Sequence, residues 1–273
     1  MGRLSGGSAG ARRRDAGRTI LWLANAAICL FLLAPIVVVI VASFSDRPYL
    51  VFPPRGLSLR WYAQFFASRE LTSSLVLSLE LGLLASAAAT VLGVLAALPL
   101  VSLRVRGIET VRALFAAPLM VPGIVVGIAM LIYYNRIRLG GSFASMLLAH
   151  VALTLPYVIR IVSAGLQSFD RSVEEAARSL GAGPTRVLLD VTLPLIRGSI
   201  LAAAILAFII SFDEVVVTLF LAGPRLSTLP VTIYNYIEHT SDPSIAAVST
   251  VLVVATTVVV LVVDRTVGFT RFL

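Results

Sequence analysis

Six long apolar runs constrain the fold of this chain more than any other feature of its sequence. A membrane-spanning helix takes roughly 20 apolar residues, and each run approaches or exceeds that length. Inside a bilayer the backbone polar groups must bond to one another, so runs of this length predict helices. We expect six spanning helices, at about residues 20–44, 72–101, 113–134, 143–164, 198–222 and 245–263.

The composition fits an all-α polytopic membrane protein. Hydrophobic residues make up 58% of the chain and charged residues 13%, and the mean hydropathy is +0.97. A soluble globular domain would not have these values. The single cysteine, Cys29, lies inside the first apolar run, which excludes an intrachain disulfide and a multi-cysteine metal site.

The distribution of charged residues predicts that the chain has two parts, and it predicts the orientation of the chain in the membrane. Residues 1–18 are rich in Gly, Ser and Arg and predict a disordered basic cytoplasmic tail, followed by one membrane domain in residues 19–273. With six spans, 15 of the 22 basic residues fall on the same side as the tail, so the positive-inside rule predicts that both termini are cytoplasmic. In the first outer loop, Trp61, Tyr62 and Phe65 predict an interfacial anchor.

All 22 basic residues are arginine, and the formal net charge is +8. The arginines flank apolar runs in short groups and do not cover one solvated face, which argues against a nucleic-acid partner. A chain without lysine cannot form a P-loop, because the lysine of that motif reaches the β and γ phosphates of the nucleotide. Any ATP hydrolysis must therefore come from another chain.

Two patterns inside the runs predict how the helices pack. The second run carries small residues at three- and four-residue spacing, which favours a close approach of neighbouring helices. These residues are Gly82, Ser86, Ala89, Gly93 and Ala97. In the third run, Pro118 and Pro122 each remove a backbone hydrogen bond, which is tolerated at membrane depth only where protein or a cavity surrounds the free carbonyl.

The polar stretch 172–200 separates the fourth run from the fifth. Ser172 followed by Glu175 predicts a capping box with a helix starting at Val173, and Gly181 is placed to end that helix in a left-handed conformation. Pro184 suits the first turn of a second helix, through about residue 189, and Pro194 prevents this helix from continuing into the next span. Two short helices with a sharp bend result. A capped amphipathic loop lying at the interface fits the same composition.

The same stretch carries a sequence pattern. Glu175-Ala176-Ala177, Gly181 and the segment 191–194 match E-A-A-x-x-x-G-x(9)-I-x-L-P, with Val in place of Ile. The pattern resembles that of the membrane subunits of ABC importers. The segments F-P-P-R-G-L-S-L-R-W-Y, L-P-Y-V-I-R and S-F-D-E-V-V-V-T-L-F look like the spermidine/putrescine permease branch of that family, and specifically its C-type subunit.

The resemblance implies a type I importer permease (MetI-like) fold and a transport subunit that is not an enzyme. It also implies import of a small, polyamine-like cation by alternating access across a bacterial cytoplasmic (inner) membrane. The implied partners are two ATPase subunits that hold ATP and Mg, a second homologous permease subunit in a heterodimer, and a periplasmic or extracellular solute-binding protein. No cofactor is implied for this chain itself.

In the family, the loop corresponding to residues 167–197 docks into the ATPase and transmits its closure to the membrane helices. By resemblance, this loop 167–197 would couple the two subunits here. The implied coupling residues are Glu175, Ala176, Ala177, Gly181, Ala182, Gly183, Pro184, Arg186, Leu193 and Pro194.

Four polar groups fall at similar depth in the predicted helices: Asp213, Glu214, Glu80 and His150. A charge at mid-bilayer costs about 2.5–3.5 kcal/mol, so such groups usually face a cavity or a partner. Glu214 shares a polar stripe with nearby hydroxyls, so we expect it to face a transport pathway and to stabilise a cation in transit, with help from Asp213 and Glu80. Asp213 itself is expected to point toward a neighbouring helix. His150 fits a hydrogen-bonded core histidine better than a pathway residue. Structural roles for the three carboxylates are the alternative.

Other functions fit the sequence less well. His150 and His239 are too far apart for an H-E-x-x-H metal site, and this argues against an intramembrane hydrolase. A proton-coupled secondary transporter could use Asp213 and Glu214 as a relay, but it would not explain the bent internal helices. Within the importer class, an opine or an amino-acid derivative is an alternative substrate.

Overall fold

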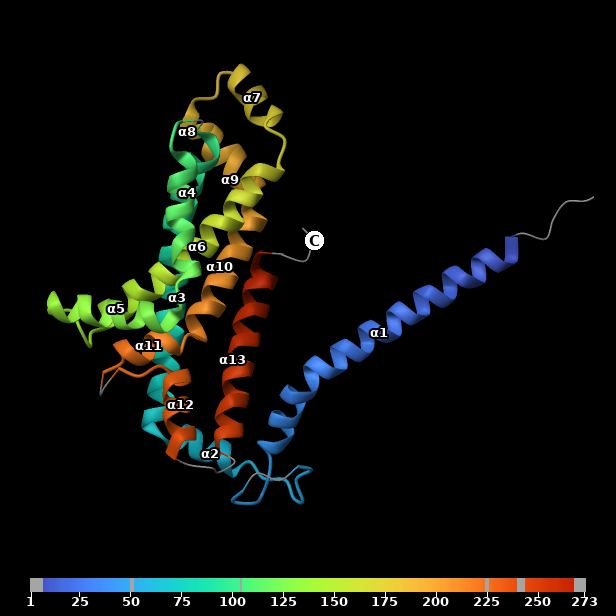
Figure 1. The fold of residues 1–273 in the computed structure, drawn as a ribbon, viewed down its shortest axis with the longest axis vertical. Coiled ribbons are helices and arrows are strands. Elements are labelled where there is room, and N and C mark those ends of the chain that lie inside the picture. Colours follow the sequence, from blue (N-terminus) through green and yellow to red (C-terminus); the bar gives the residue numbers. More distant parts are fainter. Residues whose placement is uncertain (1–6, 50–51, 104, 224–225, 240–243, 268–273) are drawn as a thin grey trace, which may run out of the picture. The chain divides into compact units, whose positions relative to one another are not determined.

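The computed structural model describes residues 7–49, 52–103, 105–223, 226–239 and 244–267. Most of these residues are helical, as the apolar runs predict (Figure 1). The elements are α1 Gly7–Ala42, α2 Arg60–Ala67, α3 Arg69–Ser102, α4 Ile108–Ala116, the 3₁₀ helix η1 Ala117–Met120, α5 Gly123–Arg136, α6 Phe143–Ser168, α7 Ser172–Ser179, α8 Pro184–Val187, the π-helix η2 Leu188–Thr192, α9 Leu193–Leu195, α10 Arg197–Phe212, α11 Val216–Leu221, α12 Leu229–His239 and α13 Ser244–Val267.

The chain divides into two compact units, one of residues 1–65 with 241–250 and one of residues 66–240 with 251–273. In the first unit α1 begins at Gly7, so residues 7–18 are helical where the sequence predicted a disordered tail. Alanine and arginine are good helix formers, and extending a helix that already exists avoids the cost of a new nucleus. Residues 1–6 of the predicted tail lie outside the described residues.

Two of the three aromatic residues that the sequence predicted as an interfacial anchor are buried in the protein. Trp61 and Phe65 are 8% and 1% exposed, and the Trp61 Nε1–H group donates a hydrogen bond to the Ser45 carbonyl at 2.8 Å. The Tyr62 hydroxyl lies 2.5 Å from Ser43 Oγ. Polar tips that bond to the protein's own loop have no need of the lipid headgroup region, and these residues instead fix the loop that follows α1.

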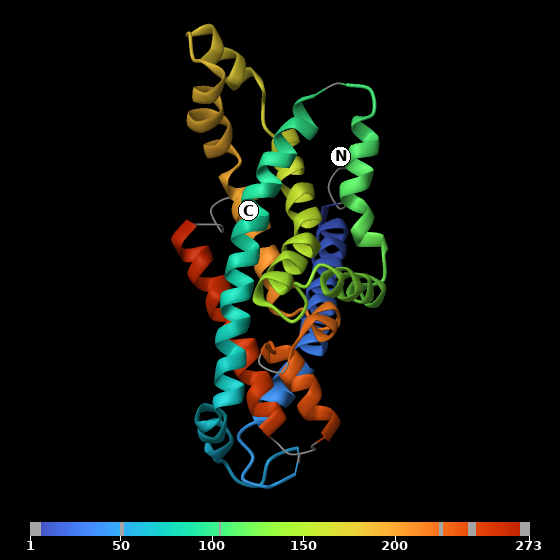
Figure 2. The ribbon, with the colours of Figure 1, turned by 90° about the vertical axis from the view of Figure 1, so that its left-hand side faces the viewer.

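In the second unit, α3, α6 and α10 pack side by side and form the main core (Figures 1 and 2). The small-residue stripe of α3 is buried in this core, which confirms the prediction of a close helix contact. At Gly93 a methyl group would lie 2.4 Å from Val158 Cγ1 of α6, so no larger residue fits without moving the helices apart. The core residues are Ala89, Ala97, Val158, Val162, Leu166, Ile196, Ala203 and Ala207.

Four described helices are long and apolar enough to cross a membrane, or up to six if each of two bent pairs is one span. The third predicted span is one of the bent pairs: α4 with η1 meets α5 at 100°, where the sequence predicted one helix over residues 113–134 (Figure 1). Val121 adopts an extended conformation because the ring of the following Pro122 disfavours the helical one. Two prolines so close together break the helix and do not merely kink it.

The fifth predicted span is also interrupted. The helix α10 ends at Phe212 and α11 begins at Val216, so Asp213 and Glu214 lie in a break and not within one helix. Three consecutive valines follow Glu214, and β-branched residues are weak helix formers. The Val217 amide donates a hydrogen bond to Glu214 Oε1 at 2.8 Å, which supplies an acceptor at the new helix start.

At the far end of this unit from α7, α12 covers the start of α3 (Figure 2). The segment after α11 is helical over Leu229–His239. The Leu229 amide donates to Ser78 Oγ at 2.8 Å, and the hydroxyls of Ser74 and Thr232 lie 3.0 Å apart. These bonds hold the segment after α11 against α3.

Candidate functional site

The loop 167–197 begins with a helix whose cap differs from the predicted one. The α7 helix starts at Ser172, and the Ser172 amide donates a hydrogen bond to Asp170 Oδ1 at 2.9 Å. The predicted capping box of Ser172 with Glu175 is therefore wrong, because Asp170 offers an acceptor two residues before the helix, as aspartate commonly does in turns. The same hydrogen bond holds the pKa of the Asp170 carboxyl below its usual range, so acidification weakens the cap.

The end of α7 forms as predicted. Gly181 adopts a left-handed conformation with φ +88°. Its amide donates to the Arg178 carbonyl at 2.9 Å, and the Ala182 amide donates to the Ala177 carbonyl at 3.1 Å. These two bonds define a Schellman motif, which satisfies the last carbonyls of α7 and turns the chain sharply. Pro184 occupies the first turn of α8, where its missing N–H group costs nothing.

The second arm of the loop is longer than predicted. It continues past residue 189 through the π-helix η2 and α9, and it meets α10 at 67°. Pro194 cannot donate the hydrogen bond that an α-helix requires at its position. The Leu193 amide bonds instead to the Leu188 carbonyl, five residues back, which is the spacing of a π-helix. The predicted break before the fifth span is therefore present, at Ile196.

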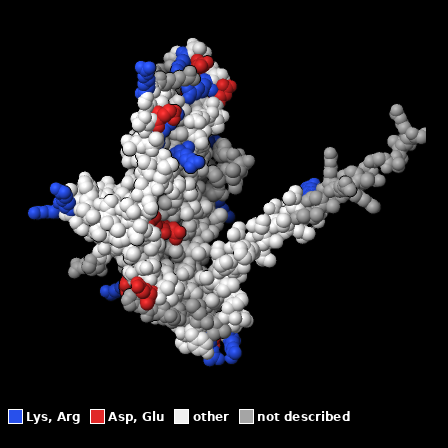
Figure 3. Space-filling model, viewed as in Figure 1, with Lys and Arg blue, Asp and Glu red and all other residues white. Residues whose placement is uncertain are grey.

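The two arms of the loop present a mixed surface. Charged side chains gather over α7 and α8, whereas the visible faces of the helices of the second unit are mostly uncharged (Figure 3). Leu180, at the tip, is 89% exposed, and Leu189 is 56% exposed. Ala177, Ala182 and Leu193 are half-buried, and the other seven implied coupling residues are exposed: Glu175, Ala176, Gly181, Gly183, Pro184, Arg186 and Pro194.

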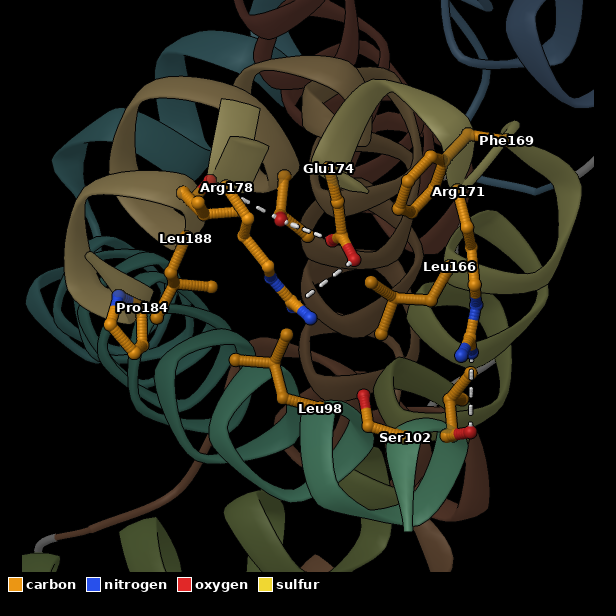
Figure 4. Close-up of a pocket in the computed structure, with 12 residues that line it drawn as sticks. Leu98, Ser102, Leu166, Phe169, Arg171, Glu174, Arg178, Pro184 and Leu188 are labelled. Atoms are coloured by element: carbon orange, nitrogen blue, oxygen red, sulfur yellow. Dashed lines mark hydrogen bonds and ion pairs between the residues drawn. The ribbon is translucent and has the colours of Figure 1, made fainter. Parts of the chain in front are cut away.

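One polar residue of the loop was missed by the sequence pattern. Glu174, next to the Glu175 of the motif, points back toward the second arm, and its Oε1 accepts a hydrogen bond from the Thr192 hydroxyl at 2.5 Å (Figure 4). Its Oε2 lies 3.8 Å from the Arg178 guanidinium. The four-residue spacing of Glu174 and Arg178 could have indicated the ion pair, but nothing in the sequence indicates the pairing with Thr192.

A cavity of about 140 Å³ lies under α7, between the ends of α3 and α6 and the start of α8 (Figure 4). Glu174 and Arg178 line one side, and the apolar side chains of Leu98 and Leu166 line another. Arg171, at the edge of the cavity, donates to the Val101 carbonyl at 3.4 Å and so connects the loop to the end of α3.

The acidic residues at membrane depth lie differently from the prediction. Asp213 is exposed in the break between α10 and α11, whereas Glu214 is half-buried and caps α11. A break, and not a continuous helix, sets the directions of these two side chains, so the helical stripe that placed Glu214 in the prediction is absent here. Glu80 is exposed on α3 and lines a groove of about 860 Å³. Glu70, Ser73 and other polar residues line the same groove.

His150 is a core residue, as the sequence favoured. It is 1% exposed, and its ring bridges both sides of the break in the fifth span. Nδ1 lies 2.8 Å from Ser211 Oγ of α10, and Nε2 lies 2.9 Å from Thr218 Oγ1 of α11. The imidazole thus holds in place the segment that carries Asp213. The structure does not bring His150, Glu80 and Asp213 together through hydrogen bonds or ion pairs among the described residues.

Residues 89–269 match the family of binding-protein-dependent transport system inner membrane components. The putrescine transport system permease protein PotI of Escherichia coli (strain K12) is 33% identical over 236 residues, 84% of this chain and 84% of PotI. The spermidine/putrescine transport system permease protein PotC of the same strain is 32% identical over 235 residues, 86% of this chain and 89% of PotC.

A crystal structure of a bacterial ABC transporter involved in the import of alginate shares the fold, with a TM-score of 0.74, 15% identity and coverage of 94% of this chain and 96% of that one. The chain belongs to the family of binding-protein-dependent transport system inner membrane components. It is a permease subunit of an ABC importer, a transport protein and not an enzyme, with the MetI-like permease fold.

Proposed function

We propose that this permease moves a small, polyamine-like cation into the cytoplasm by alternating access, driven by ATP hydrolysis on partner subunits. The bent loop 167–197 carries this proposal. Its Schellman turn and the 67° bend before α10 form a shaped lever joined directly to a membrane helix. The putrescine and spermidine relatives support the substrate class.

The proposed complex contains two ATPase subunits, a second homologous permease and a solute-binding protein outside a bacterial cytoplasmic membrane. ATP and Mg would bind to the ATPase subunits, since this chain has no lysine for a P-loop. Exposed Leu180 and Leu189 on the loop supply apolar contact area, and Arg186 supplies charge for acidic groups of the ATPase. The ten implied coupling residues would shape or line this contact.

The complex itself provides the first test. The tagged chain, purified from its host in mild detergent, is expected to retain an ATPase and a second permease. Liposomes that contain this complex together with internal ATP and Mg should take up labelled putrescine or spermidine when the binding protein is added outside. Uptake driven by a proton gradient without ATP would contradict the proposal. ATP-driven uptake of an opine or amino-acid derivative, but of no polyamine, would correct its substrate class alone.

The exposed carboxylates provide the second test. We propose that Asp213 and Glu80 stabilise the cation in transit, with Glu214 positioning the segment by capping α11. A charged hydrogen-bond partner contributes about 1.5–3 kcal/mol, compared with about 1 for a neutral one. Asp213→Asn and Glu80→Gln are therefore each expected to raise the KM for polyamine uptake about fivefold to tenfold.

Glu214→Gln serves as the matched variant, because its amide oxygen still accepts the Val217 N–H bond. Its KM should change less than that of Asp213→Asn. The proposed pathway would be wrong if Asp213→Asn and Glu80→Gln both assembled normally and kept the unmodified KM and maximal rate.

A further inference from the structure

We infer that Glu174 is a positioning residue that latches α7 to the π-helix η2, so that the two arms of loop 167–197 move as one body. The inference rests on the proposed coupling function of this loop. The latch is the hydrogen bond from the Thr192 hydroxyl to Glu174 Oε1, at 2.5 Å, across 18 positions of sequence.

Apolar packing does not fix α7 in place. None of its eight residues is buried, and a cavity of about 140 Å³ separates it from the ends of α3 and α6. A helix this short is not stable on its own in water. Its position must therefore be set by polar contacts and by the turns at its two ends.

The turn at the end of α7 fixes its direction less firmly than a helix would. Gly181 and Gly183 flank the bend, and glycine has the widest choice of backbone conformations. At the other end of α7, Asp170 and Arg171 make exposed contacts to Ser172 and Val101. Among the side-chain hydrogen bonds and ion pairs of the described residues, only the Glu174 bond joins α7 to the second arm.

The geometry makes the hydrogen bond stronger than the ion pair. The Glu174 side chain is 18% exposed and Thr192 is 4% exposed, so the bond to the carboxylate is largely shielded from water. The Arg178 side chain is 61% exposed and 3.8 Å away, and exposed ion pairs contribute little. Arg178 mainly orients the carboxylate toward Thr192.

The π-helix explains how Thr192 reaches this position. Inserting one extra residue into a helical turn rotates every later side chain relative to the first arm, and π-turns occur often at functional sites. Thr192 is the last residue of η2, and α9 and α10 follow it directly. A displacement of α7 would thus reach the membrane helix α10 through Glu174, Thr192 and the chain that continues from Thr192.

The test uses the whole transporter with Thr192→Val, which keeps the shape of the side chain and removes its hydroxyl. Losing one hydrogen bond to a charged group favours the unlatched loop by roughly tenfold. We expect the ATP hydrolysed per solute imported to rise about threefold or more, while the ATPase rate falls less than the import rate. Thr192→Ser should restore the ratio, and Glu174→Gln should give an intermediate value, because its amide oxygen still accepts the bond.

Thr257→Val on α13 makes the same change where the hydroxyl bonds only to the Val253 carbonyl of its own helix, and it should leave the ratio unchanged. Hydrogen exchange in the detergent-solubilised chain gives a second measurement, which does not depend on assembly. The amides of α7 should exchange about tenfold faster in Thr192→Val, whereas those of α3 should not change.

An unchanged transport ratio in a normally assembled Thr192→Val complex would overturn the latch. Unchanged exchange in α7 would overturn it even if the variant failed to assemble. Neither result would contradict the proposed function, which fails only if the unmodified complex shows no ATP-driven uptake.

Discussion

Replacing Gly181 by proline is expected to reduce ATP-driven uptake by about two orders of magnitude, given a cost of about 3 kcal/mol or more for a proline in an incompatible position. Proline fixes φ near −65°, whereas Gly181 has φ +88°. Proline also lacks the N–H group that bonds to the Arg178 carbonyl at 2.9 Å. The Schellman turn cannot form, so α8 would leave α7 in another direction and the loop would no longer fit the ATPase.

A graded series separates this effect from general instability. Gly181→Ala keeps the N–H group, and a methyl group there would meet no atom within 4 Å. Its cost is the strain of a left-handed alanine, about 1–2 kcal/mol. Gly107 has φ +89° and equally open surroundings, but it lies between α3 and α4, outside the loop.

Gly107→Ala should therefore lose about the same stability as Gly181→Ala, while only the Gly181 variant should change uptake and ATPase binding. For both variants, stability is measured as the melting temperature in detergent and transport as uptake in liposomes. Equal uptake by the two alanine variants, together with normal uptake by Gly181→Pro, would contradict the role of the bend.

The shape of this loop could be predicted largely from sequence because its determinants are local. A left-handed glycine and a proline in a first turn each act within about four residues. The cap was misassigned because Asp170 and Ser172 are both good local acceptors, and only the fold decides between them. The helical course of the apolar runs was predictable for a similar reason, since length and composition alone determine it.

The two broken spans and the polar pairings were not predictable in the same way. Pro118 and Pro122 indicated an interruption of the helix, but the 100° angle between its two parts depends on the residues that pack on either side of the break. Thr192 lies 18 positions from Glu174, and the partners of His150 lie 61 and 68 positions away. No local signal specifies such pairs, and the direction of Asp213 followed from a break that the apolar pattern hides.

His150 joins the two halves of one of these broken spans, so its replacement should destabilise the protein more than most single changes. His150→Leu removes both hydrogen bonds at a site that is 1% exposed, and the buried hydroxyls of Ser211 and Thr218 lose the imidazole as a partner. Each buried hydroxyl that loses its partner lowers the stability by about 1–3 kcal/mol, and by less where the hydroxyl can bond to a carbonyl of its own helix. We expect a total loss of about 2–4 kcal/mol, measured by thermal denaturation in detergent.

The hydroxyls provide the control for this prediction. Replacing a donor and its acceptors together by apolar groups of similar shape can be nearly neutral, because no buried polar group then lacks a partner. The triple variant His150→Leu, Ser211→Ala and Thr218→Val should therefore be more stable than His150→Leu alone, a non-additivity expected of residues in direct contact. If the losses of stability from the three substitutions simply added, the histidine bridge would contribute little, and the positions of α10 and α11 would have to be set by apolar packing alone.

Asp213 lies in sequence between the two hydroxyls that His150 bridges, so His150→Leu should also raise the KM for the cation, whereas a bridge with no bearing on the pathway would leave the KM unchanged.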